Sequence, residues 1–498
     1  MPQRLLNTPV DLGIPDTIEA SPLYKMINPD SIAFWGASNN FSSMGTNQLS
    51  SLLDLGFAGR VYPVHPKESH VLGLKAYGQV ADLPETPDLA ILILPTKIVL
   101  DTLIQCGKKG IKHAIIVSGG FQESGAGGRK LQQQLMQAAR SYGMRFLGPN
   151  CLGVTNPHKR LNTTFLPFVG RPGYLGMVSQ SGSFITQMFA YLARRGMGFS
   201  TAISVGNEAD IDMVAGLKYL AACPHTRVIN LYIETIRNPK AFITVAKRIT
   251  PQKPIVAYYV GGSESGRQAS LSHTGALSGP DVLYEGLFRQ TGIIRAGTIE
   301  EMFDISAVLG NKTWPRGDRV IIQTHSGGPG AVAADACDRE GLTVAPLPRS
   351  LKKPLADLVP HTGTVGNPVD ITFSKDRSAY FASIPDCLLR GDNYDILLVY
   401  LLMPESMFAR VLRGMDVPQD KIAPETVKLI EGVAASFSRL SQTHGKPVIG
   451  FSFHAQDSLV IKTFQDKNIP VLPSPNRAAR AIAAVCRYIA WRKSINAD

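Results

Sequence analysis

Short apolar runs alternate with helical patterns along the chain, and this alternation limits its fold more than any other feature. The runs fall into three groups, which begin near residues 31, 174 and 319. Buried strands that alternate with helices form parallel sheets covered by helices on both faces. We therefore predict an α/β protein of consecutive doubly wound (Rossmann or flavodoxin-like) domains with mainly parallel sheets. The predicted strands are Ser31–Trp35, Gly59–Pro63, Leu89–Leu94, Lys112–Val117, Tyr174–Val178, Phe199–Ile203, Val228–Ile233, Pro254–Val260, Ile293–Arg295, Arg319–Gln323, Leu342–Ala345, Asp395–Leu402 and Pro447–Phe451.

The length of the chain and two breaks in the pattern predict three domains. With 498 residues the chain is too long for a single core. Proline and glycine are frequent between residues 157 and 173, and a polar junction follows at Asn311–Asp318. We predict domains at residues 1–156, 157–305 and 306–498.

Composition and charge narrow the classes of function. The net charge of +12 suits anionic ligands. Lysine and arginine are dispersed without a basic run, which argues against nucleic acid as a partner. The six cysteines lie far apart without metal-ligand spacing, so we predict reduced thiols and no metal site. Since no apolar run approaches the ~20 residues that span a bilayer, and no signal peptide is evident, we predict a soluble, cytoplasmic protein.

Two features in the first domain suit a phosphorylated ligand. Small residues between Gly36 and Gly45 separate a predicted strand from a helix, where backbone N–H groups can meet a phosphate. The match to the dinucleotide-binding pattern is imperfect at Ser38 and Phe41, and an ordinary tight turn is the alternative. Lys67 follows the second strand, where an NAD site expects an acid. A lysine suits the phosphorylated ribose of CoA or NADP, although a surface lysine would look the same.

The second domain has a serine-rich turn before a helix and an acid at the end of a strand. Ser181, Gly182 and Ser183 precede a segment with one apolar face, so hydroxyl groups, free N–H groups and the positive end of a helix dipole meet there. A simple serine cap is the alternative. Glu234 ends a predicted strand and can be either a partner for a histidine or an exposed acid.

His273 lies in a loop of small residues after the strand Pro254–Val260. The carboxyl ends of strands in open α/β sheets carry ligands and chemistry. The imidazole can serve as general base, metal ligand or phosphoryl carrier, or have no role.

The sequence around His273 resembles the active-site loop of the NDP-forming acyl-CoA synthetases, the superfamily that includes succinyl-CoA synthetase. The resemblance runs from about residue 25 to 495. Further segments that resemble signatures of the family are Tyr62–Lys67, Val117–Glu123, Leu147–Asn156, Ser204–Asp212 and Gly366–Asp370.

The resemblance implies a set of roles for individual residues. His273 would be transiently phosphorylated, with Glu234 as its partner and the phosphate held by Ser181, Gly182 and Ser183. Asn150 would lie near the reacting centre. CoA would be bound by Gly36, Ser38, Gly45, Lys67 and Pro95. His325, in the loop Thr324–Gly330, is not assigned to the catalytic set.

The implied activity is that of an α-type subunit, which interconverts acyl-CoA, phosphate and ADP with a carboxylic acid, CoA and ATP. No segment resembles the ATP-grasp domain of the family, so the resemblance implies a hetero-oligomer with an ATP-grasp β subunit that holds ATP or ADP and Mg²⁺. The acyl group and the choice of ATP or GTP stay open. The alternatives are a non-catalytic CoA-binding or regulatory protein and an NADP-dependent oxidoreductase.

Overall fold

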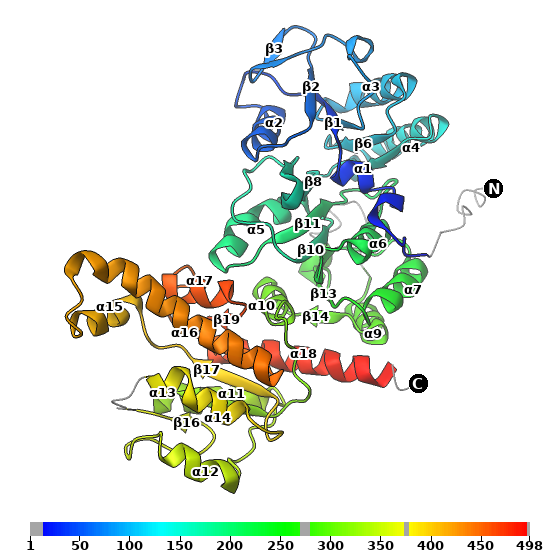
Figure 1. Ribbon diagram of the computed structural model, residues 1–498. Coiled ribbons are helices and arrows are strands. Elements are labelled where there is room, and N and C mark those ends of the chain that lie inside the picture. The colour runs from blue at the N-terminus through cyan, green and yellow to red at the C-terminus, as the bar shows by residue number, and fades with distance from the viewer. Residues whose placement is uncertain (1–12, 269–278, 373–377, 496–498) are drawn as a thin grey trace. The chain divides into compact units, whose positions relative to one another are not determined.

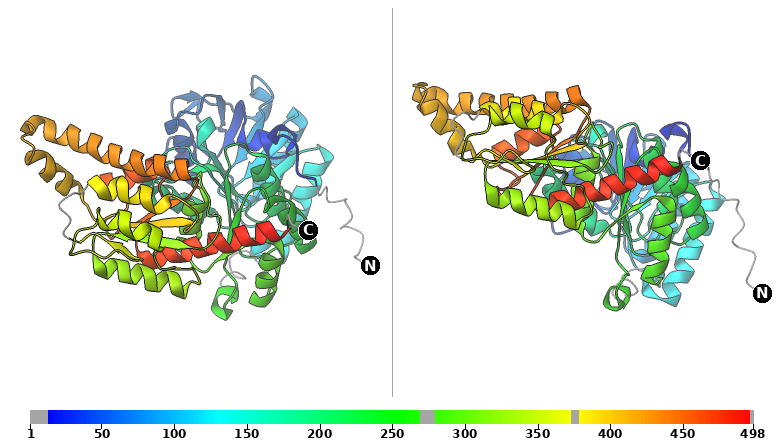
Figure 2. Two further views of the ribbon diagram at one scale, coloured as in Figure 1. Left: turned by 60° about the horizontal axis from the view of Figure 1, so that its bottom comes forward. Right: turned by 90° about the horizontal axis from the view of Figure 1, so that it is seen from below.

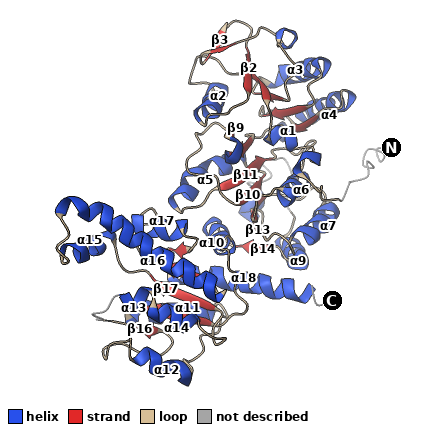
Figure 3. Ribbon diagram, viewed as in Figure 1, coloured by secondary structure: helices blue, strands red, loops and turns tan. Residues whose placement is uncertain are grey.

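The chain divides into two compact units, each built around parallel strands. The computed structural model describes residues 13–268, 279–372 and 378–495. The first unit comprises residues 1–193 and 197–296, and the second comprises residues 194–196 and 297–498 (Figure 1). In both units helices flank the strands, as predicted (Figure 3). The predicted domain boundaries at residues 156 and 305 stay predictions.

The first sheet has five parallel strands in the order β2-β1-β5-β6-β7. Its faces are covered by different helices, because α1 and α2 pack against Ile32 and Phe34 whereas α3 and α4 pack against Ala33 and Trp35. The elements are α1 (Tyr24–Ile27), β1 (Ser31–Trp35), α2 (Met44–Asp54), β2 (Arg60–Val64), the hairpin β3 (His70–Val71) and β4 (Leu74–Lys75), β5 (Leu89–Leu92), α3 (Thr96–Lys109), β6 (His113–Ile116), α4 (Ala126–Ser141) and β7 (Arg145–Leu147).

The second sheet has seven strands in the order β14-β13-β12-β10-β11-β8-β9. Only β8 and β9, at one edge, run antiparallel to their neighbours. The elements are β8 (Val154–Asn156), β9 (Leu161–Asn162), β10 (Leu175–Ser179), α5 (Gly182–Arg194), β11 (Phe199–Ser204), α6 (Met213–Ala222), β12 (Val228–Ile233), α7 (Pro239–Ile249), β13 (Ile255–Tyr259), α9 (Asp281–Thr291) and β14 (Ile294–Ala296).

The first two sheets share a core, which explains why they form a single unit. One continuous cluster of buried apolar side chains includes Phe34 of β1, Leu49 of α2 and Leu217 of α6. Polar contacts reinforce it: the Gln48 amide donates to the carbonyl oxygens of Leu152 (3.3 Å) and Thr163 (3.0 Å). Burial of such a cluster is the main force that holds the two sheets together.

The second unit contains the third sheet, with five parallel strands in the order β16-β15-β17-β18-β19. The helices α14 and α16 cover one face, and α16 extends beyond the sheet as a pair with α15 (Figure 2). The elements are α10 (Ile299–Leu309), β15 (Val320–Thr324), α11 (Gly327–Arg339), α12 (Arg349–Ala356), β16 (Val369–Asp370), α13 (Ser378–Phe381), α14 (Ser383–Leu389), β17 (Ile396–Tyr400), α15 (Glu405–Arg413), α16 (Ile422–His444), β18 (Val448–Phe451), α17 (Leu459–Asp466), β19 (Val471–Leu472) and α18 (Pro475–Ile495).

The predicted strand Leu342–Ala345 is wrong, because only Thr343 pairs with the sheet, in an isolated bridge to Arg319. Its place beside β15 is taken by β16 and by the Asn367 side chain. That amide donates to the carbonyl oxygen of Val320 (2.8 Å) and accepts from the N–H of Ile322 (3.0 Å). A side chain therefore satisfies backbone groups that a longer strand would have paired.

A buried ion cluster joins α10 to α18 within the second unit. Asp304 is 2% exposed and accepts bidentate hydrogen bonds from Arg477 (2.6 and 2.9 Å) and a further bond from Arg195. Two guanidinium groups therefore balance one buried carboxylate, whose charge would be costly to bury without a partner.

Candidate active site

The turn between β10 and α5 builds the predicted phosphate site. The Ser179 hydroxyl donates to the carbonyl oxygen of Ser181 (2.6 Å) and accepts from the Ser181 N–H (3.2 Å). This turn starts α5 at Gly182, with the Ser181 and Ser183 hydroxyl oxygens 3.4 Å apart. The first N–H groups of a helix lack partners within the helix and favour an anion. The three predicted residues therefore lie together at a helix start.

The topology of the second sheet places this turn at a crevice. After β10 the chain forms β11 on one side of it and then β12 on the other. Open α/β sheets bind ligands outside the carboxyl ends of the strands where the strand order reverses in this way. Glu234 follows β12 directly and so lies at the same reversal as Ser181.

Glu234 is a buried acid, with 3% of its surface exposed. The alternative of an exposed acid at a strand end is therefore excluded. Its N–H donates to Oε1 of Gln180 (2.6 Å), and so does the N–H of Thr235 (3.0 Å). Gln180 is the residue between Ser179 and Ser181, so its side chain links the phosphate turn to the strand end that carries Glu234.

Glu208 lies on the other side of Gln180 and is also buried. Its Oε2 accepts from Nε2 of Gln180 (3.0 Å). Burial raises the pKa of Glu208 to about 7, against the opposing effect of the Arg237 charge. Neither Gln180 nor Glu208 was predicted as a site residue from the sequence. Gln180 is next to the predicted Ser181, and Glu208 lies in the segment Ser204–Asp212 that resembles a family signature, but one sequence gives no sign of which strand-end side chains meet.

Asn150 lies in a loop that packs against the same helix start. Its φ is +57°, its N–H donates to the carbonyl oxygen of Ser118 (2.9 Å), and its Nδ2 donates to Oδ1 of Asn207 (3.3 Å). A Cβ on Gly182 would lie 2.6 Å from Cγ of Leu152. The loop after β7 and the start of α5 are therefore in close contact.

His273 lies outside the described residues, so its predicted role stays a prediction. The strand β13 ends at Tyr259, and Gly279 is the first described residue after the segment that contains His273. The Tyr259 hydroxyl donates to the carbonyl oxygen of Gly279 (2.7 Å), and its ring stacks on Tyr284 at 3.6 Å between centroids.

Two of the five residues predicted to bind CoA line a cavity of about 550 Å³ at the strand-order reversal of the first sheet. Gly36 and Ser38, which follow β1, line it, as do residues that follow β2 and β5. Gly45 lies beneath this lining, since a Cβ there would be 2.2 Å from the Gly36 carbonyl oxygen. The glycines therefore let α2 and β5 approach the turn closely.

Lys67 and Pro95 lie beside the cavity rather than in its lining. The Lys67 N–H donates to Nδ1 of His65 (3.2 Å), which does line the cavity. Pro95 immediately precedes α3, whose exposed Ile98 also lines it. The lining residues that were not predicted from the sequence are Trp35, Ala37, Val64, His65, Pro66, Gly78, Gln79, Val80, Leu94, Ile98, Thr102 and Gln105.

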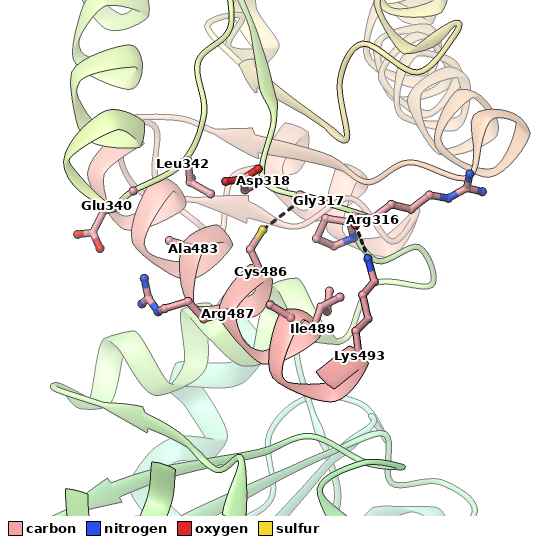
Figure 4. Close-up of a pocket in the computed structure, with 13 residues that line it drawn as sticks. Arg316, Gly317, Asp318, Glu340, Leu342, Ala483, Cys486, Arg487, Ile489 and Lys493 are labelled. Atoms are coloured by element: carbon pink, nitrogen blue, oxygen red, sulfur yellow. Dashed lines mark hydrogen bonds between the residues drawn. The ribbon is translucent and has the colours of Figure 1, made fainter. Parts of the chain in front are cut away.

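A second cavity, of about 440 Å³, lies in the second unit between α18 and the start of β15 (Figure 4). Several of its polar groups already have partners in the protein. The Lys493 ammonium donates to the Arg316 carbonyl oxygen (2.6 Å), and the Cys486 thiol contacts the Gly317 carbonyl oxygen (3.5 Å). No predicted site residue lines this cavity.

Cys151 has the environment of a structural residue rather than a reactive one. Burial raises the pKa of the Cys151 thiol to about 12, in keeping with a packed, reduced cysteine. Within the described ranges no three His, Cys, Asp or Glu side chains are grouped to hold a metal ion. Among the described helices none is long and apolar enough to cross a membrane.

Three family models match the chain in succession. They are a CoA binding domain at residues 30–157, a succinyl-CoA ligase like flavodoxin domain at residues 172–309 and a Ligase-CoA domain at residues 320–434. None of the three is an ATP-grasp domain, in agreement with the predicted fold class.

Whole proteins match as well. The α subunit of the ADP-forming acetate–CoA ligase II of Pyrococcus furiosus is 37% identical over 92% of this chain and 96% of that protein. The ADP-forming acetate–CoA ligase I of Archaeoglobus fulgidus is 37% identical over 76% of this chain and 54% of that protein. The solved structure of the Ca. Korarchaeum cryptofilum dinucleotide forming acetyl-coenzyme A synthetase 1 in complex with phosphate and ADP has a TM-score of 0.82 and 32% identity, over 95% of this chain and 98% of that one. The chain therefore belongs to the family of ADP-forming acyl-CoA ligase α subunits, within the NDP-forming acyl-CoA synthetase superfamily.

Proposed function

We propose that the chain is the α subunit of an acid–thiol ligase that interconverts acyl-CoA, phosphate and ADP with a carboxylic acid, CoA and ATP. The observation that carries this proposal is the meeting of a serine-rich helix start and a buried acid, Ser181 and Glu234, at one strand-order reversal. A phosphoryl group needs donors for its oxygens, and a histidine that carries it needs a carboxylate partner.

The first sheet contributes the CoA site. A cavity of about 550 Å³ whose lining includes Gly36 and Gly78 suits a ligand whose phosphates approach the backbone closely. Gly36, Ser38 and Gly45 would shape this approach, while Lys67 and Pro95 would lie along a ligand that extends from the cavity. CoA would supply the thiol that forms and breaks the thioester bond.

The reaction would proceed through two covalent exchanges on this chain. In the thioester-cleaving direction, a phosphate oxygen attacks the acyl carbon, the C–S bond breaks, and CoA leaves as the thiol. The His273 imidazole then attacks the phosphorus of the acyl phosphate, and the carboxylate leaves. Ser181, Gly182 and Ser183 would hold the phosphoryl oxygens, Glu234 would stabilise the cationic imidazole, and Asn150 would border the reacting atoms.

The last exchange, the transfer of the phosphoryl group from His273 to ADP, would take place on a second chain. The names of relatives such as the P. furiosus α subunit imply a partner, and we propose an ATP-grasp β subunit that holds ADP or ATP with Mg²⁺ in a hetero-oligomer. A small carboxylic acid or its CoA thioester would be the substrate, and the cytoplasm the compartment.

Phosphorylation of His273 is the direct test. The full chain, alone and with an ATP-grasp chain from the same genome, is incubated with acetyl-CoA and radiolabelled phosphate, and acid-labile protein phosphate is measured. We expect labelling of the wild type, none of His273→Ala, and normal labelling of His361→Ala, which replaces an exposed histidine in the second unit. CoA binding should survive in His273→Ala.

The alternatives give other results. A non-catalytic CoA-binding protein would bind CoA but acquire no phosphate in either preparation. An NADP-dependent oxidoreductase would bind NADP in preference to CoA, which calorimetric titration of both ligands decides.

A further inference from the structure

The Gln180 amide uses all its hydrogen-bonding capacity, and its orientation is thereby fixed. Oε1 accepts from the N–H groups of Glu234 and Thr235. Nε2 donates to the Thr235 carbonyl oxygen (2.9 Å) and to Oε2 of Glu208 (3.0 Å). A flipped amide would bring N–H groups against N–H groups and oxygen against oxygen. The Gln180 amide is therefore held in one orientation, in which its Nε2 requires a hydrogen-bond acceptor on Glu208.

The Glu208 carboxylate is an acceptor on both of its oxygens. Oε1 accepts from the Met213 N–H at the start of α6 (2.8 Å), and Oε2 accepts from Gln180. Nε of Arg237 lies 3.6 Å from Oε2, and the charge of Asp212 lies close enough to raise the pKa of Glu208. With 6% of its surface exposed, the carboxylate has little water to replace these partners.

The Glu208 backbone is also fixed in place. Its φ is +51°, its N–H donates to the Val205 carbonyl oxygen (3.1 Å), and its own carbonyl oxygen accepts from Arg237 (3.3 Å). A non-glycine residue in this region is held there by surrounding structure. The carboxylate thus projects from a rigid turn after β11 toward the reversal between β10 and β12.

We propose that Glu208 is a positioning residue for phosphoryl transfer: through the Gln180 amide it fixes the turn that carries Ser181 relative to the strand end that carries Glu234. This inference rests on the proposed function. The hydrogen bonds of the Glu208 carboxylate lead to Gln180 and to the start of α6, so its effect on the phosphate turn passes through Gln180. Small misplacements of groups that hold a reacting phosphate lower rates by up to about 100-fold.

Exchange of the Gln180 and Glu208 side chains tests the hydrogen bond between them. In Glu208→Gln, one oxygen becomes an NH₂ group that faces a donor from either Gln180 or Met213. In Gln180→Glu, a carboxylate oxygen faces the Glu208 carboxylate. In the double variant the NH₂ group introduced at position 208 can donate to the carboxylate introduced at position 180, and the amide oxygen at position 208 can still accept from Met213. The double variant then lacks the contact with the Thr235 carbonyl oxygen, and Arg237 faces a neutral amide in place of the Glu208 carboxylate.

The experiment measures the first-order rate of phosphohistidine formation and the dissociation constant for CoA in the full chain with its ATP-grasp partner. We expect each single variant to be about tenfold to 100-fold slower with an unchanged dissociation constant. The double variant should be faster than the product of the two single effects predicts. Asp212→Asn is the matched control: it removes a neighbouring charge but keeps a side chain that can cap α6, so we expect the wild-type rate.

The outcomes separate this inference from the proposed function. Wild-type rates in Glu208→Gln, single effects that simply multiply in the double variant, or a loss of CoA binding that parallels the loss of rate would overturn the positioning role while leaving the proposed function intact. Absence of phosphohistidine in the wild type with its partner would overturn the proposed function, and this inference with it. If Glu208→Gln does not fold, Gln180→Glu and the double variant supply the comparison.

Discussion

Replacement of Gly36 by alanine tests the structural basis of the predicted CoA site. Gly36 follows β1 with a φ of +91°, and a Cβ built on it would lie 2.0 Å from the carbonyl oxygen of Ile93. That contact is with backbone after β5, which cannot rotate away as the end of a side chain can. The turn after β1 must therefore shift, and the cavity lined by Gly36 and Ser38 must change shape.

The loss of folding free energy in Gly36→Ala has two parts, and a matched variant separates them. A positive φ costs a non-glycine residue about 1–2 kcal/mol, and forcing an extra methyl group into a packed site costs about 1–3 kcal/mol more. Gly73 has a φ of +81°, and a Cβ built on it would have no heavy atom within 4 Å, so Gly73→Ala incurs only the first part. The entropy that alanine removes from the unfolded chain is common to both variants and cancels.

The assay follows the unfolding of the first unit alone. The chain has three tryptophans, and replacement of Trp314 and Trp491 by phenylalanine leaves Trp35, the last residue of β1, as the reporter. We expect denaturant unfolding to show Gly36→Ala about 1–3 kcal/mol less stable than Gly73→Ala, and CoA affinity at least about tenfold weaker, as ~1.4 kcal/mol lost on binding would produce. Equal losses in the two variants would refute the steric reasoning, and normal CoA binding by Gly36→Ala would refute the location of the site.

Three further predictions concern buried charges and thiols. Asp304→Asn should destabilise the second unit by about 3–5 kcal/mol in denaturant unfolding, because Arg195 and Arg477 both lose the Asp304 carboxylate while keeping their charges; an effect below about 1 kcal/mol would contradict this. The raised pKa of Glu208 means that its contribution to stability is full below pH 4.5 and is lost as pH rises toward about 7. At about 1.4 kcal/mol per pH unit, the wild type should lose about 3 kcal/mol relative to Glu208→Gln across that range, whereas parallel pH profiles would disprove the burial effect. Cys151, with its pKa raised to about 12, should resist a thiol reagent at mildly alkaline pH until the chain unfolds, as mass spectrometry of the labelled peptides can verify.

The parts of the fold that could be predicted from the sequence are those set by local pattern. Apolar runs located β1, β10 and β12 to within a residue, since a buried parallel strand is apolar on both faces. The turns that follow β1 and β10 were also predicted, because a strand end followed by small residues and a helix is itself a local signal. Gly36 and Ser181 were found in this way.

The parts that could not be predicted depend on contacts between distant segments. Leu342–Ala345 has the apolar pattern of a strand, but the amide of Asn367 takes its hydrogen bonds. Glu208 lies in the segment Ser204–Asp212, which resembles a family signature, but its own role could not be predicted, since its carboxylate matters only where β10, β11 and α6 meet. His65 lies in a segment chosen for Lys67, and it is the histidine that lines the cavity. Side-chain direction at the end of a strand is decided by tertiary packing, which a single sequence does not display.

Two turns in this chain share a local hydrogen-bond pattern but differ in what their middle residue contacts. After β15, the Thr324 hydroxyl donates to the carbonyl oxygen of Ser326 (2.8 Å) and accepts from its N–H (3.0 Å), as Ser179 does with Ser181 after β10. Both turns begin a helix at a glycine, Gly327 or Gly182. The residue between the two hydroxyl residues differs.

In the turn after β15 that middle residue is His325, whose ring stacks on Tyr380 with centroids 3.4 Å apart. In the turn after β10 it is Gln180, whose amide connects Glu208 with the strand end of Glu234. The hydrogen bonds of Ser179 and Thr324 therefore explain how each helix starts, but they are the same in both turns. The middle side chain distinguishes the turns, because Gln180 connects its turn to two segments that carry buried carboxylates. A phosphorylated imidazole requires such fixed acidic and hydrogen-bonding neighbours, which is why we assign the transfer site to the turn that contains Gln180.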